Sequence, residues 1–311
     1  MEKIAIIGTG LIGRGWAMVF ARAGHEVALY DADPQALKVN LAVIRGALKD
    51  LRAAGLVKEA PDKIYKRIRA ASSLQDALAE ADYAQENVSE TLAVKKKIFA
   101  AMDKLALPGA ILASSTSTIP ASAFTKNLKG RKRCLVAHPV NPPHLVPLVE
   151  LCPAPWTSKS VLARAHALHE SVGQVPITVK KEIQGFILNR LQAVVLNAAL
   201  SLYADGYASA ADIDKTIRDG LGLRWSFMGP FETIDLNAPG GVADYAARYG
   251  QVMYEQARTQ APRRWKKEVI ARLARERRTA LPASELARRQ AWRDRRLMAL
   301  SAHKREASGK S

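Results

Sequence analysis

The fold is decided by the stretch Ile4-Ala5-Ile6-Ile7-Gly8-Thr9-Gly10-Leu11-Ile12-Gly13. An apolar run leads into three glycines with the spacing G-x-G-x-x-G, and an apolar-periodic stretch follows over residues 16–23. A second apolar run, 27–30, ends in Asp31. Strand, glycine turn, helix, strand and acidic residue therefore stand at the spacing of a dinucleotide-binding βαβ unit.

Each position of this unit has a physical role toward a dinucleotide. Gly8 permits the tight turn, Gly10 lets the backbone approach a pyrophosphate, and Gly13 lets the helix pack closely on the strand. The free N–H groups of the helix N-terminus face the phosphates. Asp31 accepts hydrogen bonds from ribose hydroxyls and repels a 2′-phosphate, which favours NAD over NADP. We therefore expect NAD to bind at Gly8, Gly10, Leu11, Ile12, Gly13 and Asp31.

Apolar runs alternate with amphipathic stretches to about residue 180, which predicts an α/β fold with a doubly wound, Rossmann-type sheet. The expected helices are 12–24, 34–54, 91–106 and 158–172, and residues 34–66 form a helical pair broken at Gly55. After residue 184 helical periodicity dominates, so we expect an NAD-binding domain, 1–184, and an all-helical domain, 185–311. The expected strands are 3–8, 26–31, 67–71, 83–88, 109–114, 133–138, 146–152 and 174–180.

Six prolines in residues 139–155 predict a rigid connection around an exposed strand, because proline cannot donate to a strand ladder. Such rigid loops beside a sheet are common places for active sites.

Composition limits the class of protein. No run approaches the ~20 apolar residues that span a bilayer, and the first strand follows Met1-Glu2 directly, so neither a membrane span nor a signal peptide is expected. Cys134 and Cys152 lie in apolar runs, which predicts buried free thiols in a reducing compartment and a cytoplasmic protein.

The net charge of +18 is concentrated at the C-terminal end. Residues 263–311 hold 16 Lys+Arg and 5 Asp+Glu, a difference of +11, and the other 262 residues hold +7. A basic stretch can bind nucleic acid or a membrane surface. Because aromatic residues are sparse there, we favour a solvated helical face and expect no nucleic-acid partner.

His138 is the leading candidate for acid–base chemistry. It ends an apolar strand-like run, where doubly wound sheets bind ligands, and imidazole exchanges protons near neutral pH. Glu150 lies in the next strand-like run; if that strand is adjacent, its carboxylate can hold the imidazole N–H. The alternative is a capped core histidine beside an ordinary glutamate. His144, in the proline-rich loop, is the rival base.

Two further polar features stand near these positions. Five hydroxyl residues, 114–118, follow an apolar run and form either a substrate contact or a turn with local hydrogen bonds. Asn189 lies on the first helix of the second domain and is either a packing residue or a substrate contact. His166 and His169 share a helix face without a third ligand, so we expect surface residues and no metal.

These segments together resemble the 3-hydroxyacyl-CoA dehydrogenase superfamily over essentially the whole chain. Within it, the sequence is most similar to the lambda-crystallin branch, which implies L-gulonate 3-dehydrogenase activity. The branch similarity lies in residues 220–230, 236–238 and 287–298. The superfamily similarity lies in residues 8–13, 86–95, 114–118, 138–143, 147–150 and 185–190.

The resemblance implies roles for individual residues. His138 is the base that removes the hydroxyl proton, and Glu150 orients it. Ser117 and Asn189 hydrogen-bond the reacting oxygen or the histidine. Glu90 and Lys95 lie along the cofactor. The resemblance also implies a homodimer formed through the second domain.

Arg224 is the residue that bears on the substrate. Its planar fork matches a carboxylate bidentately, so it either anchors a small hydroxy acid or makes a structural or intersubunit ion pair. The leading expectation is NAD-dependent oxidation of the 3-hydroxyl of a small hydroxy acid, with L-gulonate as the named candidate. The alternatives are a 3-hydroxyacyl-CoA dehydrogenase, a carnitine dehydrogenase, a crystallin-like structural protein, and nucleic-acid binding through residues 263–311.

Overall fold

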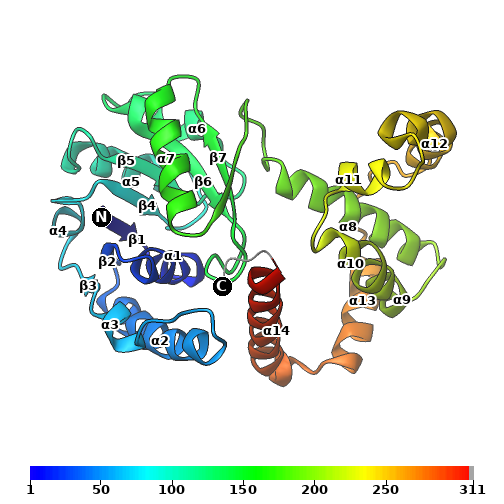
Figure 1. Ribbon diagram of the computed structural model, residues 1–311, viewed down its shortest axis with the longest axis horizontal. Coiled ribbons are helices and arrows are strands. Elements are labelled where there is room, and N and C mark those ends of the chain that lie inside the picture. Colours follow the sequence, from blue (N-terminus) through cyan, green and yellow to red (C-terminus); the bar gives the residue numbers. More distant parts are fainter. Residues whose placement is uncertain (308–311) are drawn as a thin grey trace. The chain divides into compact units, whose positions relative to one another are not determined.

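A mixed sheet of eight strands forms the centre of the N-terminal part of the chain, in a computed structural model that describes residues 1–307 (Figure 1). The strand order is β3-β2-β1-β4-β5-β6-β7-β8. The first six strands run parallel, β7 is antiparallel to β6, and β8 is parallel to β7. The strands are β1 (Lys3–Ile7), β2 (Glu26–Tyr30), β3 (Ile68–Ala70), β4 (Tyr83–Glu86), β5 (Ile111–Ser114), β6 (Cys134–Pro139), β7 (Leu148–Pro153) and β8 (Val175–Thr178).

Helices cover both faces of this sheet, and the alternation of side chains along the strands explains how. Ile4 and Ile6 of β1 belong to one buried cluster, and Ala5 and Ile7 to the other. The first cluster takes side chains from α1 (Leu11–Arg22), α2 (Pro34–Ala53), α3 (Pro61–Tyr65), α7 (Lys159–Ser171) and α14 (Leu286–Ala307). The second takes them from α4 (Leu74–Leu78), α5 (Leu92–Leu105) and α6 (Ala121–Thr125). The predicted doubly wound sheet is thus confirmed.

All eight predicted strands are present, and so are the four predicted helices and the helical pair broken at Gly55. The short helices α4 and α6 were not predicted, because five residues hold too few apolar positions to show a helical period.

The strand within the proline-rich segment was wrongly expected to be exposed. β7 lies between β6 and β8, and residues 149–152 are buried. The strand tolerates this position because Pro153 closes its end and Pro147 precedes it, so no proline interrupts the paired interior.

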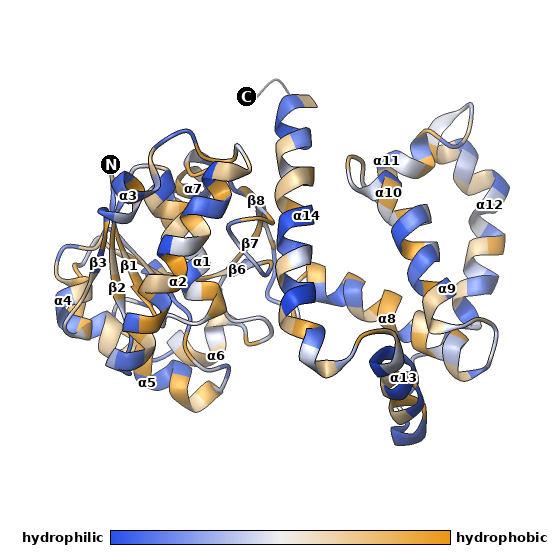
Figure 2. Ribbon diagram, turned by 90° about the horizontal axis from the view of Figure 1, so that it is seen from below, coloured by the Kyte–Doolittle hydropathy of each residue, from blue (hydrophilic) through white to orange (hydrophobic). Residues whose placement is uncertain are grey.

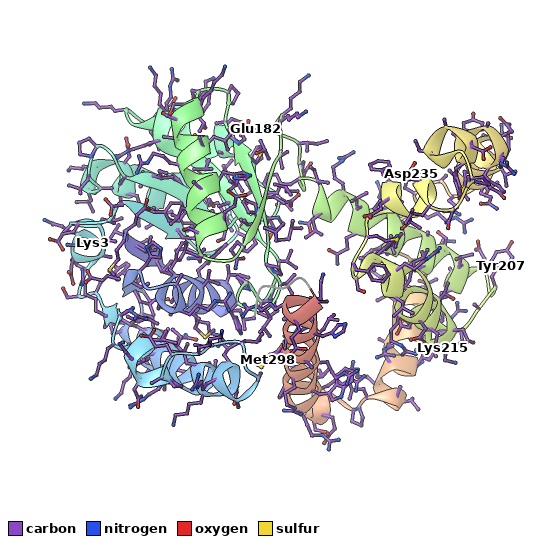
Figure 3. The ribbon with its side chains drawn as sticks, in the orientation of Figure 1. Lys3, Glu182, Tyr207, Lys215, Asp235 and Met298 are labelled. Atoms are coloured by element: carbon purple, nitrogen blue, oxygen red, sulfur yellow. The ribbon has the colours of Figure 1, made fainter. Side chains whose placement is uncertain are left out.

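The chain divides into two compact units, which differ from the predicted domains. The first unit holds Met1–Asn189 and the described residues of the C-terminal segment from Arg289 onward, and the second holds Arg190–Arg288. The first division falls five residues beyond the expected boundary at 184. Residues 289–307 were expected in the second domain; they belong to the first unit because Met298, labelled on α14 in Figure 3, is buried in its core.

The second unit is helical throughout. Figure 2 draws much of its helix α13, and several turns of α14, in the hydrophilic colour, as expected for the basic segment. Its elements are the larger part of α8 (Leu188–Ala204), then α9 (Ala210–Lys215), the π-helical turn Thr216–Leu221, α10 (Gly222–Trp225), α11 (Pro230–Asp235), α12 (Gly241–Arg258), α13 (Lys267–Ala280) and the 3₁₀ turn Ala283–Glu285.

Both cysteines are buried and unpaired, as the sequence predicts. Burial raises the pKa of each thiol to about 12, so both are protonated at neutral pH. Among residues 1–307, no helix is both long and apolar enough to cross a bilayer.

Candidate active site

His138 and Glu150 form a buried pair at the end of β6. The two residues stand directly opposite each other in the antiparallel ladder between β6 and β7. The Nδ1 atom of His138 lies 2.8 Å from Oε2 of Glu150, and His138 is only 5% exposed. The adjacency expected from the sequence is therefore present. The Nε2 atom of His138 has no hydrogen-bond partner among the described residues.

The carboxylate of Glu150 is fixed from its other side by the backbone that enters α8. Its Oε1 atom accepts hydrogen bonds from the N–H groups of Ile187, at 2.8 Å, and Leu188, at 2.9 Å. Burial alone would raise the pKa of Glu150, but the hydrogen bonds from His138 and these two N–H groups outweigh it and lower the pKa. Glu150 is therefore ionised at neutral pH.

Phe186 is a site residue that the sequence analysis missed. Its ring is fully buried, with its centroid 5.4 Å from that of the His138 imidazole. Its φ of 49° lies in the left-handed region, directly after Gly185 with a φ of 77°. This bend turns the following N–H groups onto Glu150. A glycine followed by a large apolar residue at the domain boundary was the available signal.

Ser117 and Asn189 are brought together by the backbone oxygen of Ser117. The Nδ2 atom of Asn189 donates to that oxygen at 3.0 Å, and the N–H of Ser117 donates to Oε1 of Glu90 at 2.8 Å. The Oγ atom of Ser117 has no hydrogen-bond partner in residues 1–307. The hydroxyl segment is thus a turn fixed from two sides, with one hydroxyl remaining available.

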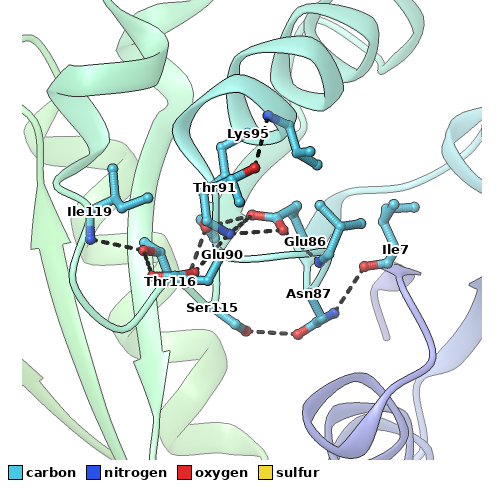
Figure 4. A network of polar contacts seen from close by, with 12 residues as sticks. Ile7, Glu86, Asn87, Glu90, Thr91, Lys95, Ser115, Thr116 and Ile119 are labelled. Atoms are coloured by element: carbon cyan, nitrogen blue, oxygen red, sulfur yellow. Dashed lines mark hydrogen bonds and ion pairs between the residues drawn. The ribbon is translucent and has the colours of Figure 1, made fainter.

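Glu90 and Lys95 belong to an ionic network, drawn in Figure 4, in which Lys95 is buried and Glu90 is exposed. The Nζ atom of Lys95 lies 3.1 Å from both carboxylate oxygens of Glu86 and 3.2 Å from Oε2 of Glu90. Lys95 is 1% exposed and Glu86 is fully buried. Sequence reasoning missed Glu86, because its position within β4 predicted only a strand residue.

The two carboxylates of this network respond differently to burial. For Glu86, burial outweighs the stabilisation by Lys95 and raises the pKa. For Glu90, burial is outweighed by the hydroxyl of Thr116, the charge of Lys95 and the N–H of Ser117, so the pKa is lowered. Glu90 is therefore ionised at neutral pH, and its carboxylate holds the turn that contains Ser117.

The glycine turn has the geometry of a dinucleotide cradle. Gly8 has a φ of 91°, and a Cβ atom there would lie 2.8 Å from the carbonyl oxygen of Asn87. A Cβ atom on Gly13 would lie 1.9 Å from the carbonyl oxygen of Gly8. In contrast, nothing lies within 4 Å of a Cβ on Gly10, which begins α1 without a side-chain cap. The space in front of the α1 N-terminus is thus open to phosphate oxygens.

Asp31 lies at the carboxyl end of β2 and is tied to this turn. Its Oδ2 atom accepts hydrogen bonds from Thr9 N, at 2.8 Å, and Thr9 Oγ1, at 2.7 Å. Burial would raise its pKa, but hydrogen bonds from the backbone of Asp33 and from Thr9 lower it. A fixed, ionised acceptor beside an open helix N-terminus fits a dinucleotide with free ribose hydroxyls.

The other histidines differ from His138 in their surroundings. His144 makes no ion pair or hydrogen bond with a carboxylate among residues 1–307, and burial together with the charge of Arg22 lowers its pKa to about 4. His169 was wrongly expected on the surface: it is fully buried, and its Nε2 atom lies 3.0 Å from the hydroxyl of Tyr83. His169 lies on the side of α7 that faces the sheet, whereas His166 is half-exposed. The i, i+3 spacing of the two histidines does not show which of them is buried.

Tyr83 connects His169 to a polar network beneath the cofactor cradle. Its hydroxyl donates to Gln85, whose Nε2 atom donates to Ser115 Oγ at 2.7 Å. Ser115 in turn donates to Oδ1 of Asn87 at 2.7 Å, a contact visible in Figure 4. This network fixes Asn87, the residue against which Gly8 packs.

Arg224 belongs to the second unit, in α10, and is exposed. Its guanidinium makes no ion pair or hydrogen bond with another described residue, so the structural ion pair considered from the sequence is absent within residues 1–307.

Comparison with known proteins identifies the family. Residues 3–183 match the 3-hydroxyacyl-CoA dehydrogenase NAD-binding domain, and residues 185–279 match the C-terminal domain of the same family. A lambda-crystallin homolog from Bos taurus is 42% identical over 306 residues, covering 96% of this chain and 94% of that protein. An L-carnitine dehydrogenase from Streptomyces coelicolor is 36% identical over 80% of this chain and 78% of its own.

A solved structure covers the whole chain at a TM-score of 0.85 and 26% identity, over 100% of both chains. It is an NAD⁺-dependent dismutase, 5-formyl-3-hydroxy-2-methylpyridine 4-carboxylic acid 5-dehydrogenase. The chain described here therefore belongs to the 3-hydroxyacyl-CoA dehydrogenase family and is an NAD-dependent dehydrogenase that acts on a 3-hydroxyl group.

Proposed function

We propose that this enzyme oxidises the 3-hydroxyl of a small free L-3-hydroxy acid, with L-gulonate as the first candidate, and that His138 is the general base. The observation that carries the proposal is the His138–Glu150 pair, in which Nδ1 of His138 lies 2.8 Å from the carboxylate and Nε2 has no hydrogen-bond partner among the described residues.

The fixed pair determines which nitrogen accepts the proton. Because Glu150 is ionised and can only accept, the Nδ1 atom of His138 carries the hydrogen and Nε2 is the basic atom. When Nε2 takes the hydroxyl proton of the substrate, the carboxylate of Glu150 stabilises the resulting imidazolium.

We propose that Ser117 and Asn189 position the reacting oxygen. Ser117 Oγ has no partner within residues 1–307, and Asn189 uses only one amide hydrogen, on Ser117 O. Both groups can therefore donate to a substrate oxygen without breaking a hydrogen bond of the fold.

The cofactor fits the cradle already described. Bound NAD supplies the hydride acceptor. Its pyrophosphate would lie on the N–H groups of Leu11, Ile12 and Gly13, with Gly8 and Gly10 allowing the approach, and its ribose hydroxyls on Asp31. Glu90 and Lys95 would lie along the cofactor, where their network fixes the turn of Ser117.

We propose that Arg224 anchors the substrate carboxylate. Its guanidinium makes no ion pair or hydrogen bond with residues 1–307, and a guanidinium binds a carboxylate bidentately. Two relatives are named for free acids, L-carnitine and a pyridine carboxylic acid, which supports a free-acid substrate. The second candidate is a 3-hydroxyacyl-CoA thioester, which the family name favours.

Variants of Arg224 and free CoA separate the two candidates. Arg224→Ala should lower kcat/KM for L-gulonate by about 10- to 100-fold, the value of a charged hydrogen-bonded contact, and Arg224→Lys should restore only part of it. Free CoA should not inhibit. Unchanged gulonate kinetics in Arg224→Ala, or competitive inhibition by CoA, would exclude the carboxylate anchor.

We further propose a cytoplasmic homodimer. The two buried free thiols favour a reducing compartment. In the second unit, α12 has no buried residue, although one side of it carries the half-buried Tyr245 and the exposed Val242, Tyr249, Val252 and Met253. An apolar stripe that its own chain leaves exposed is typical of an interface between subunits.

A further inference from the structure

A pocket of about 750 Å³ lies within the first unit, apart from the residues assigned to catalysis and NAD. It is lined by the end of α1, the loop after β6, the start of β8 and the last turns of α14. Arg22 is the final residue of α1, whereas Gly10 caps its beginning. Twelve residues at 1.5 Å per residue separate the pocket from the phosphate end of that helix by about 18 Å.

The charged side chains of this pocket are mainly cationic. Arg22, Lys304 and Arg305 line it, against the single acid Glu170, which lies 3.3 Å from His166. Arg22 donates one hydrogen bond, to the carbonyl oxygen of His144 at 2.9 Å, and makes no ion pair in residues 1–307. Burial and the neighbouring charge of Arg305 lower the pKa of Arg22 to about 10, as expected of a cation short of a counter-charge.

Gln174 gives the pocket a specific polar feature. The residue is 5% exposed, and neither its Nε2 nor its Oε1 atom has a hydrogen-bond partner in the described chain. The buried Nδ1 atom of His144 also lacks one. Buried amides are almost always hydrogen-bonded, so an amide with both ends unpaired indicates a ligand that supplies the missing donor and acceptor.

The remaining walls are apolar and include Leu145, Pro147 and Val175. The volume is within the range of small-molecule sites, which combine apolar walls with a few convergent polar groups. A bare inorganic ion would leave both the walls and the Gln174 amide unused, and an organic molecule with an anionic group would use all of them.

We propose that this pocket binds a small organic anion, whose phosphate or carboxylate lies against Arg22 and Lys304 and whose polar substituent pairs with Gln174. The ligand would contact the loop that follows β6, the strand that carries His138, and the end of the helix whose N-terminus faces the cofactor. A ligand bound there would therefore contact segments that carry the base and the cofactor helix, without occupying the substrate site or the NAD site.

The test measures binding to full-length protein saturated with NADH, so that the glycine turn cannot take the anion. The probes are phenyl phosphate, benzoate and neutral benzyl alcohol, which share a ring and differ in the charged group; inorganic phosphate is the fourth. Titration calorimetry and thermal shift are read together. We expect phenyl phosphate or benzoate to bind and to raise the melting temperature, and benzyl alcohol to have no effect. The stronger binder of the two anions shows whether the pocket prefers a phosphate or a carboxylate.

Three variants locate the site. Gln174→Leu breaks no hydrogen bond of the fold and should melt no lower than the parent, but it should weaken binding at least tenfold. Gln174→Glu and Lys304→Glu should abolish binding through repulsion. The matched control, Lys49→Glu, changes an exposed lysine of α2 outside the pocket and should bind as the parent does.

The proposal is overturned if neither organic anion binds the NADH-saturated protein. Binding that survives Gln174→Leu and Lys304→Glu, or that falls equally in Lys49→Glu, would show non-specific attraction to a basic protein and would equally overturn it.

Discussion

Two neighbours from different parts of the chain, Glu150 and Phe186, fix the orientation of the His138 imidazole. His138→Gln removes the base and leaves the cradle of Gly8 and Gly13 untouched. We expect kcat to fall by about 10²- to 10⁴-fold, the usual contribution of general-base catalysis, with NADH affinity near the parent value. Stopped-flow kinetics and NADH fluorescence titration measure the two quantities. The exposed His303→Gln serves as the control. A large loss of NADH binding would mean that His138 is structural.

Glu150→Gln tests the role of the carboxylate more directly, because it keeps the shape of the side chain and changes the tautomer of His138. The amide oxygen can still accept from Ile187 and Leu188, but its NH₂ then faces Nδ1 of His138. Nδ1 becomes the acceptor and Nε2 carries the hydrogen, so the ring cannot take a proton from substrate. We expect a loss in kcat of about 10²- to 10⁴-fold at neutral pH. Turnover near the parent level would show that the carboxylate does not set the tautomer.

The same variant has a defined effect on stability against pH. The folded-state pKa of Glu150 lies below its unfolded value of about 4.3, so its ionised form stabilises the fold at pH values above 4.3. This contribution is lost as the pH falls through the lowered folded-state pKa. The difference in unfolding free energy between parent and Glu150→Gln should therefore shrink on acidification. Urea denaturation at neutral and acid pH measures it, and a difference independent of pH would contradict the assignment.

At the scale of elements, the turn between β1 and α1 offers a matched pair of substitutions. Gly13→Ala places a Cβ atom 1.9 Å from the oxygen of Gly8, so the helix must move from the strand and the protein should lose stability. Gly10→Ala has free space for its Cβ and should fold normally, but it fills the position of the pyrophosphate and should weaken NADH binding. Thermal melting and NADH titration separate the two effects. Equal behaviour of both variants would contradict the cradle.

Elements were the part of the structure most readily predicted from sequence. Buried parallel strands are continuous apolar runs, so the apolar runs at residues 4–7 and 134–137 were sufficient to predict strands there. The pairing of His138 with Glu150 was expected only if β6 and β7 were adjacent, because register is a tertiary property. Phe186 and Glu86 were missed, since a left-handed bend and a buried ion pair leave no periodic signal.

For the molecule as a whole, the division at Asn189 and Arg288 shows what sequence could not predict. The charge of the C-terminal segment predicted a helical face in solvent, and α14 does carry many polar residues. Its contribution to the first unit comes from the buried Met298, from the partly buried Leu297 and Ala302, and from Ser301 donating to the oxygen of Leu145. Composition averages over a segment and does not detect a few apolar side chains among many charged ones.

The exposed stripe of α12 gives the prediction for assembly. Val252→Asp introduces a charge into the apolar stripe, whereas Gln251→Asp lies on the opposite face of the same helix. If the stripe forms the interface between subunits, Val252→Asp should dissociate the dimer and Gln251→Asp should not. Sedimentation velocity gives the answer. A parent protein that sediments as a monomer, or a Val252→Asp dimer, would exclude this interface.

The most direct test of the central claim is the initial rate of NAD reduction by the purified enzyme with four substrates. These are L-gulonate, L-carnitine, L-3-hydroxybutyrate and 3-hydroxybutyryl-CoA, each measured for the parent and for His138→Gln. The account predicts the highest kcat/KM for a free acid, with L-gulonate first, and loss of turnover in the variant. A preference for the thioester, or turnover that persists in His138→Gln, would contradict it.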